Sequence, residues 1–117
     1  MILKDFIAAV ERTAPVELAA EWDNPGLLVG PAETDIRDVL VTLDCTAAVA
    51  DEAAERGCQL VLSHHPLFFH PVKHILRDDP ETAAAWTLLR HGVGLYAAHT
   101  NQDSAEGGVN DMLCGLF

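Results

Sequence analysis

The chain has 117 residues, half of them hydrophobic, and its 18 acidic against 7 basic side chains give a formal net charge of −11. This length and hydrophobic content argue against a disordered chain and predict at most one domain, or a part of one, with enough buried surface for a core, over residues 1–117. The negative charge disfavours nucleic acid and anionic lipid as partners, and the chain has no apolar run of the ~20 residues needed to span a membrane, so we expect a cytoplasmic protein.

The first 30 residues predict one helix, one turn and one strand. Apolar residues at helical spacing predict an amphipathic helix over residues 2–12, which Pro15 ends. Residues 22–26, with the sequence WDNPG, are typical of a turn. The short apolar segment 27–30 that follows is a strand candidate.

The rest of the chain alternates strands with helices. Apolar, β-rich segments predict strands at residues 39–43, 59–63 and 93–98, and a last short helix is expected at 109–113. Strand–helix alternation is typical of parallel strands, and strands without polar alternation are typical of a sheet covered on both faces. The predicted fold class is therefore α/β, with three layers and a mostly parallel sheet flanked by helices.

The two helices between these strands have recognisable ends. Thr46 is a good N-cap for an alanine-rich helix that ends before Gly57. Asp79 and Pro80 occupy the N-cap and first positions of the next predicted helix. Gly92 follows that helix as its stop signal.

The three cysteines are Cys45, Cys58 and Cys114. They are odd in number and have no CxxC spacing, which disfavours a disulfide framework or a zinc knuckle. We interpret them as reduced thiols packed in the interior.

Polar residues with metal-binding side chains follow each of the three strands. Asp44 follows the first, His64 and His65 the second, and His99 the third, with Asp103 a few residues further on. Ligands of open parallel sheets bind at the carboxyl ends of the strands, so these groups should gather at one edge of the sheet. Imidazole and carboxylate are ligands that Zn, Mn and Fe(II) accept. The pattern predicts a metal site there.

The adjacent histidines bear on the number of ions. Pro66 favours an extended backbone at His65, and neighbouring side chains of an extended backbone point to opposite sides. One ion could take both His64 and His65 only if the chain bends, whereas two ions could take one each. Asp103 could then bridge the two ions, as carboxylates do in two-metal sites. The alternative is that one histidine of the pair only packs or hydrogen-bonds.

Other polar residues are interpreted as structural. His70, His74 and His91 are expected to be ordinary surface or loop histidines. Asp23 and Asn24 are expected to form hydrogen bonds within their turn, with a place at the edge of the site as the alternative.

Four segments together resemble a known family. They have the sequences EWDNPGLLVG, LSHHPL, AHTNQD and GGVND, at residues 21–30, 62–67, 98–103 and 107–111. In this order they are similar to the motifs of the Nif-three-like proteins, also called GTP cyclohydrolase I type 2 homologues. The resemblance covers nearly the whole chain.

The resemblance implies a dinuclear centre of divalent ions (Zn, Mn or Fe) with His64, His65 and Asp103 at ligand positions. His99 matches a histidine near that centre, and because imidazole titrates near neutral pH it is the candidate general acid and base. The implied function is metal-dependent hydrolysis of a small molecule such as a nucleotide or phosphoester, by a homo-oligomer. A non-catalytic metal-binding or regulatory protein is the alternative, and a purely structural domain is a third.

The family resemblance also implies two more metal ligands, a His and a Glu from a later part of a longer chain. After Asp103 this sequence has no His, and its only Glu is Glu106. We expect the chain to be the N-terminal part of such a protein. The alternatives are that another polypeptide supplies the missing ligands, or that the site is incomplete.

Overall fold

The computed structural model describes all 117 residues and contains one sheet of four strands. The sheet has the strand order β1-β4-β3-β2. The strands are β1 (Gly26–Val29), β2 (Val39–Thr42), β3 (Leu60–Ser63) and β4 (Gly94–Ala97). All four strands expected from the sequence are therefore present, each within about two residues of its predicted place.

The sheet is mixed, and its central pairs are parallel. β2 pairs with β3 and β3 with β4 in parallel, while β1 runs antiparallel to β4 at the other edge. Parallel β2, β3 and β4 present their carboxyl ends at the same edge of the sheet. The expectation of a mostly parallel α/β sheet is confirmed, with β1 as the antiparallel exception.

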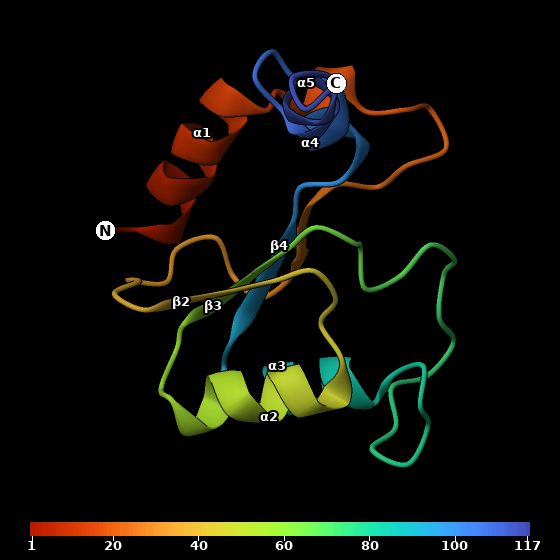
Figure 1. Cartoon of the computed structure of the whole chain (residues 1–117). Coiled ribbons are helices and arrows are strands. Elements are labelled where there is room, and N and C mark those ends of the chain that lie inside the picture. The colour runs from red at the N-terminus through yellow and green to blue at the C-terminus, as the bar shows by residue number, and fades with distance from the viewer.

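Helices cover both faces of the sheet, so the fold has three layers (Figure 1). α2 and α3 lie side by side on one face, and α1, α4 and α5 lie on the other. The α-helices are α1 (Leu3–Thr13), α2 (Ala47–Glu55), α3 (Ala83–His91), α4 (Thr100–Ser104) and α5 (Val109–Cys114), and a 3₁₀ helix, η1, spans Val16–Leu18.

Alternate residues of the central strands pack against opposite helical layers. Val61 and Leu95 are buried in the cluster that includes residues of α2 and α3. Their neighbours Leu60 and Tyr96 are buried in a second cluster with Leu3 of α1. This alternation explains why the strands lack the polar alternation of a sheet with one face in water.

The helix ends follow local chemistry at α2 but not fully at α3. Thr46 Oγ1 accepts a hydrogen bond from the Val49 backbone N–H at 3.2 Å, as predicted for an N-cap. Gly92 ends α3 with a left-handed backbone (φ +67°), which glycine adopts without strain. The predicted start of α3 at Asp79 is wrong, because Asp79 begins a separate turn and the N-cap is Thr82.

The cysteines are free, and they differ in burial. Cys45 is buried, Cys58 is half-buried and Cys114 is exposed. Reduced thiols were expected, but the interior position is wrong for Cys114. Burial raises the pKa of the Cys45 thiol to about 11.

None of the helices combines the length and the apolar character that crossing a lipid bilayer requires.

Candidate metal centre

Three histidines lie where two central strands end. His64 and His65 directly follow β3, and His99 lies between β4 and α4. The Ala98 N–H donates to the Ser63 carbonyl at 2.9 Å, which continues the pairing of the two chains up to the histidines. The edge predicted from the strand pattern is thus where these side chains lie.

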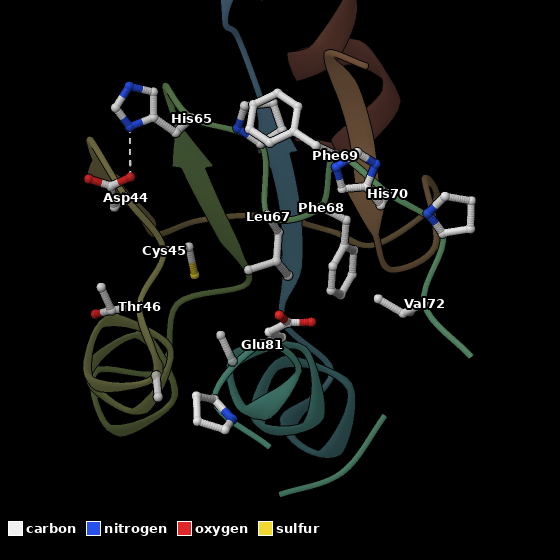
Figure 2. A pocket seen from close by; sticks show the side chains of 15 residues that line it. Asp44, Cys45, Thr46, His65, Leu67, Phe68, Phe69, His70, Val72 and Glu81 are labelled. Atoms are coloured by element: carbon white, nitrogen blue, oxygen red, sulfur yellow. Dashed lines mark hydrogen bonds and ion pairs between the residues drawn. The ribbon is translucent and has the colours of Figure 1, made fainter. Parts of the chain in front are cut away.

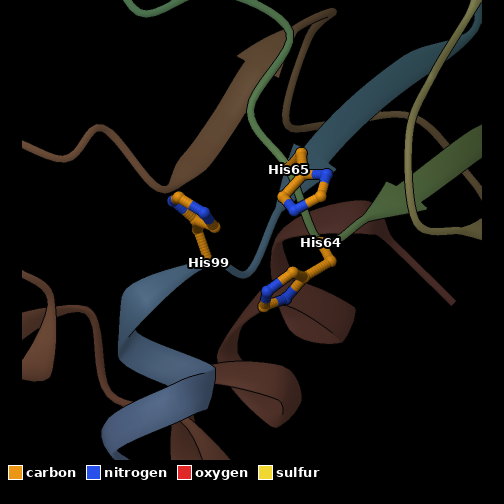
Figure 3. A group of neighbouring side chains, drawn as sticks. All are labelled: His64, His65 and His99. Carbon is orange, nitrogen blue, oxygen red and sulfur yellow. The ribbon is translucent and has the colours of Figure 1, made fainter.

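The three imidazoles form one compact cluster (Figure 3). One nitrogen from each of His64, His65 and His99 can be chosen so that all lie within 4.8 Å of one another. The ring centroids of His64 and His65 are 5.1 Å apart. The chain bends at these two residues, so the expectation that their side chains point to opposite sides is wrong. The alternation argument for two ions therefore loses its basis.

One pair of donor atoms has nearly the spacing of two ligands on a single metal ion. Ligands on one tetrahedral ion with bonds of 2.0–2.1 Å lie roughly 3.3 Å apart. Asp103 Oδ1, on α4, is 3.5 Å from His64 Nε2. That separation is too long for a strong hydrogen bond but close to the spacing of two ligands on the same ion. The donor set of imidazoles and a carboxylate suits Zn, Mn or Fe(II).

Asp44 contacts His65 from the end of β2. Its Oδ1 lies 2.6 Å from His65 Nδ1, as Figure 2 shows. This contact leaves Nε2 of His65 as the nitrogen available to an ion. A carboxylate in this position is the common outer partner of a metal-binding histidine, because it fixes the orientation of the ring.

Asp23 contacts His99 in the same manner but in a buried setting. Its Oδ1 lies 3.0 Å from His99 Nδ1, and the Asp23 side chain is fully buried. The carboxylate also accepts hydrogen bonds from the Asn24 N–H and from the N–H and hydroxyl of Thr100. Burial opposes ionisation and is the largest single influence, but these hydrogen bonds together hold the pKa of Asp23 below its ordinary value.

A buried asparagine fixes the backbone of this segment. Asn101 Oδ1 accepts a hydrogen bond from the His99 N–H at 2.8 Å. Asn101 Nδ2 donates to the Ala14 carbonyl at 2.9 Å, which ties the start of α4 to the end of α1. His99 is therefore held by its main chain and by its ring.

Aromatic side chains and a cavity surround the cluster. The rings of Trp22 and Phe69 lie 6.0 and 5.8 Å from that of His99. A surface cavity of about 550 Å³ adjoins the cluster on the side of His65 and Asp44 (Figure 2). Leu67, Phe68 and Phe69 contribute much of its apolar lining. This volume is typical of sites for small molecules.

The remaining histidines lie outside the cluster, as expected. His70 lines the cavity, His74 contacts Asp79 at 3.3 Å, and His91 is exposed at the end of α3. The sequence indicated Asp23 only as a turn residue with the site edge as an alternative. Asp23 accepts a hydrogen bond from its neighbour Asn24 and also contacts His99 at the site. The turn pattern at residues 22–26 was the only sequence feature that singled it out.

Comparisons with known proteins agree with the resemblance. A family model described as Duf34/NIF3 (NGG1p interacting factor 3) matches residues 1–117. A GTP cyclohydrolase 1 type 2 homolog of Clostridium perfringens is 44% identical over 117 residues, which cover 100% of this chain and 45% of the relative. A homolog of Bacillus subtilis with the same name is 42% identical over 94% of this chain and 30% of its own length. The chain thus spans less than half of these relatives.

Solved structures show the same fold. A Bacillus cereus protein related to NIF3 is 39% identical, with a TM-score of 0.90 over 97% of this chain and 31% of that protein. The protein HcgD of Methanocaldococcus jannaschii, solved in its reduced form, is 33% identical, with a TM-score of 0.93 over 100% of this chain and 47% of that protein.

Proposed function

The chain belongs to the Duf34/NIF3 family, and on this premise we propose that it binds divalent metal ions and contributes to a metal-dependent hydrolase of the GTP cyclohydrolase 1 type 2 homolog kind. The observation that carries the proposal is the meeting of three imidazoles within 4.8 Å at the carboxyl edge of the sheet. The proposed ligands are His64, His65 and Asp103, and the proposed ions are Zn, Mn or Fe.

Two ions remain part of the proposal. Support for two ions comes from the metal-ligand atoms that are available. Asp103 has two carboxylate oxygens, and one of them lies beside His64. A carboxylate of this kind can join two neighbouring ions. When bound, the ions would supply Lewis acidity and activate water for attack.

His99 is proposed as the general acid and base. Its Nδ1 is engaged by the buried Asp23 carboxylate, which leaves Nε2 to take up or release a proton. A carboxylate that holds one ring nitrogen fixes the tautomer of the imidazole. The same geometry would suit a fourth metal ligand, so removal of His99 must be tested for its effect on metal affinity as well as on turnover.

The proposed substrate is a small molecule, either a nucleotide such as GTP or a phosphoester. The cavity beside His65 has the volume for it. The same family relationship favours a homo-oligomer as the working form, in the cytoplasm, and residues 1–117 as the N-terminal α/β part of a longer protein.

The decisive experiment loads the protein with Mn or Zn and measures hydrolysis of GTP and of p-nitrophenyl phosphate. The parent is compared with the His64→Ala/Asp103→Ala double variant and with His74→Ala, a control for the loss of an exposed imidazole that lies in neither cavity. We expect turnover that requires both metal and the two residues. Activity that survives the double replacement would contradict the hydrolase proposal. Stoichiometric metal binding without turnover would favour the non-catalytic alternative.

A further inference from the structure

Two arginine side chains lie beside Trp86 of α3, in the helical layer that α2 and α3 form. Arg90 follows Trp86 by four residues and so lies on the same face of the helix. Its Cζ is 5.0 Å from the centroid of the indole ring. Arg77, from the loop before α3, places its Cζ 5.6 Å from the same centroid. Both distances are typical of cation–aromatic contacts.

Neither guanidinium has a carboxylate partner within 4.0 Å. In contrast, Arg56 contacts Glu52 at 2.7 Å and Arg37 contacts Asp35 at 4.0 Å. The chain has 18 acidic and 7 basic residues, so carboxylates are not scarce. Two like charges beside one ring repel each other, and an anion that contacts both would reduce that cost.

The two arginines line a surface cavity of about 390 Å³ between α2 and α3. Its other polar lining residues are Asp51, Thr87 and His91. Asp51 is the one carboxylate among them, and its Oδ1 accepts a hydrogen bond from the Thr87 hydroxyl at 3.3 Å. The volume lies in the range of small-molecule sites. The cavity shares no residue with the histidine cluster.

We propose that this cavity binds the phosphate group of a small phosphorylated molecule between Arg77 and Arg90. Guanidinium groups present paired N–H donors that match phosphate oxygens, and two of them balance the double negative charge. A polyanionic macromolecule would have to approach a chain with a net charge of −11. The competing explanation is structural: Arg90 stabilises the C-terminal end of α3, and Arg77 covers the indole.

The experiment uses Trp86 as its own reporter. Trp22→Phe removes the only other tryptophan of the chain, and the chelator-treated protein is titrated with inorganic phosphate, with glycerol 3-phosphate, and with chloride at equal ionic strength. We expect saturable fluorescence changes with both phosphates and none with chloride. Saturation by inorganic phosphate alone would identify the free ion as the ligand of the site. Changes that do not saturate, or that chloride reproduces, would overturn the proposal.

Two arginine variants separate binding from a structural role. Arg77→Gln/Arg90→Gln should weaken phosphate binding at least tenfold, as measured by ³¹P line broadening, which does not depend on the indole. Arg56→Gln, which removes an ion-paired arginine of the same layer, should bind as the parent does. If the glutamine variant does not fold, Arg77→Lys/Arg90→Lys keeps the charge and should still weaken binding. Unchanged affinity in a folded double variant would refute the site.

Discussion

The fully buried carboxylate of Asp23 lies 3.0 Å from Nδ1 of His99, a residue 76 positions later in the chain. This contact joins the turn before β1 to the start of α4, beside the antiparallel pairing of β1 with β4. The same carboxylate accepts hydrogen bonds from the Asn24 N–H and from the N–H and hydroxyl of Thr100. Together with His99 Nδ1, four donor groups contact it. Asp23 therefore orients a histidine of the candidate centre and also joins two distant segments.

Replacement of Asp23 by asparagine should destabilise the protein. Asn keeps the size of the side chain but places an NH₂ group where a carboxylate oxygen accepts hydrogen bonds, so buried donors lose their partner. We expect the free energy of unfolding to fall by about 1–3 kcal/mol, measured by urea denaturation. Asp78→Asn, at an exposed position, should change it little. Equal stability of the two variants would show that the buried carboxylate has no such role.

The lowered pKa of Asp23 predicts a dependence of stability on pH. Its pKa in the folded protein lies below the ordinary 3.8, so the unfolded chain binds the proton more tightly. The contribution to stability is therefore complete above about pH 4–5 and is lost as the pH falls through the folded pKa. Urea denaturation of the parent between pH 6 and 3 should show this loss. Asp23→Asn should show a shallower decrease, and a parallel decrease in both would contradict the assignment.

Metal binding should stabilise the folded chain through the proposed ligands. A ligand that binds only the native state at 100 times its dissociation constant adds about 2.7 kcal/mol to the free energy of unfolding. Zn or Mn should therefore raise the melting temperature of the parent but not of His64→Ala/Asp103→Ala, while His74→Ala behaves as the parent. Since three protein ligands leave many positions open on two ions, we expect less than one equivalent of metal after dialysis. Two tightly held ions per chain, by elemental analysis, would contradict this.

Local signals predicted the fold well where one residue decides an element's end. Thr46 begins α2 and Gly92 ends α3, as expected. An N-cap and a glycine with a left-handed backbone each depend on only a few adjacent residues. Asp79 and Pro80 gave the same signal without a helix start, because an aspartate can begin a turn equally well. η1 and α4 span three and five residues, too few for a periodic pattern to be recognised.

The candidate site was predictable in its location but not in its detailed geometry. The strand-end rule brought His64, His65 and His99 together, because parallel strands end at a common edge. The bend at the paired histidines overrode the side-chain alternation of an extended chain. The contact of Asp23 with His99 depends on how β1 pairs with β4, and a single sequence does not encode that register in any local pattern.

Asp44 should act on metal affinity without acting much on stability. Its side chain and that of His65 are 57% and 42% exposed, and exposed ion pairs of this kind contribute little to folding. Yet Asp44 holds Nδ1 of His65 at 2.6 Å and so orients the nitrogen proposed to bind the ion. Loss of such an outer partner commonly weakens metal binding 10–100-fold.

Asp44→Asn should therefore bind Zn about 10–100-fold more weakly than the parent, in competition with a chelating dye, while its urea denaturation curve stays close to that of the parent. Asp78→Asn serves as the matched control, because it also removes one exposed carboxylate from an acidic surface. Equal weakening in both variants would assign the effect to net charge rather than to orientation of His65. Asp23→Asn provides the contrast within the same centre, since it should lower stability even without metal, whereas the effect of Asp44→Asn appears only when metal is present.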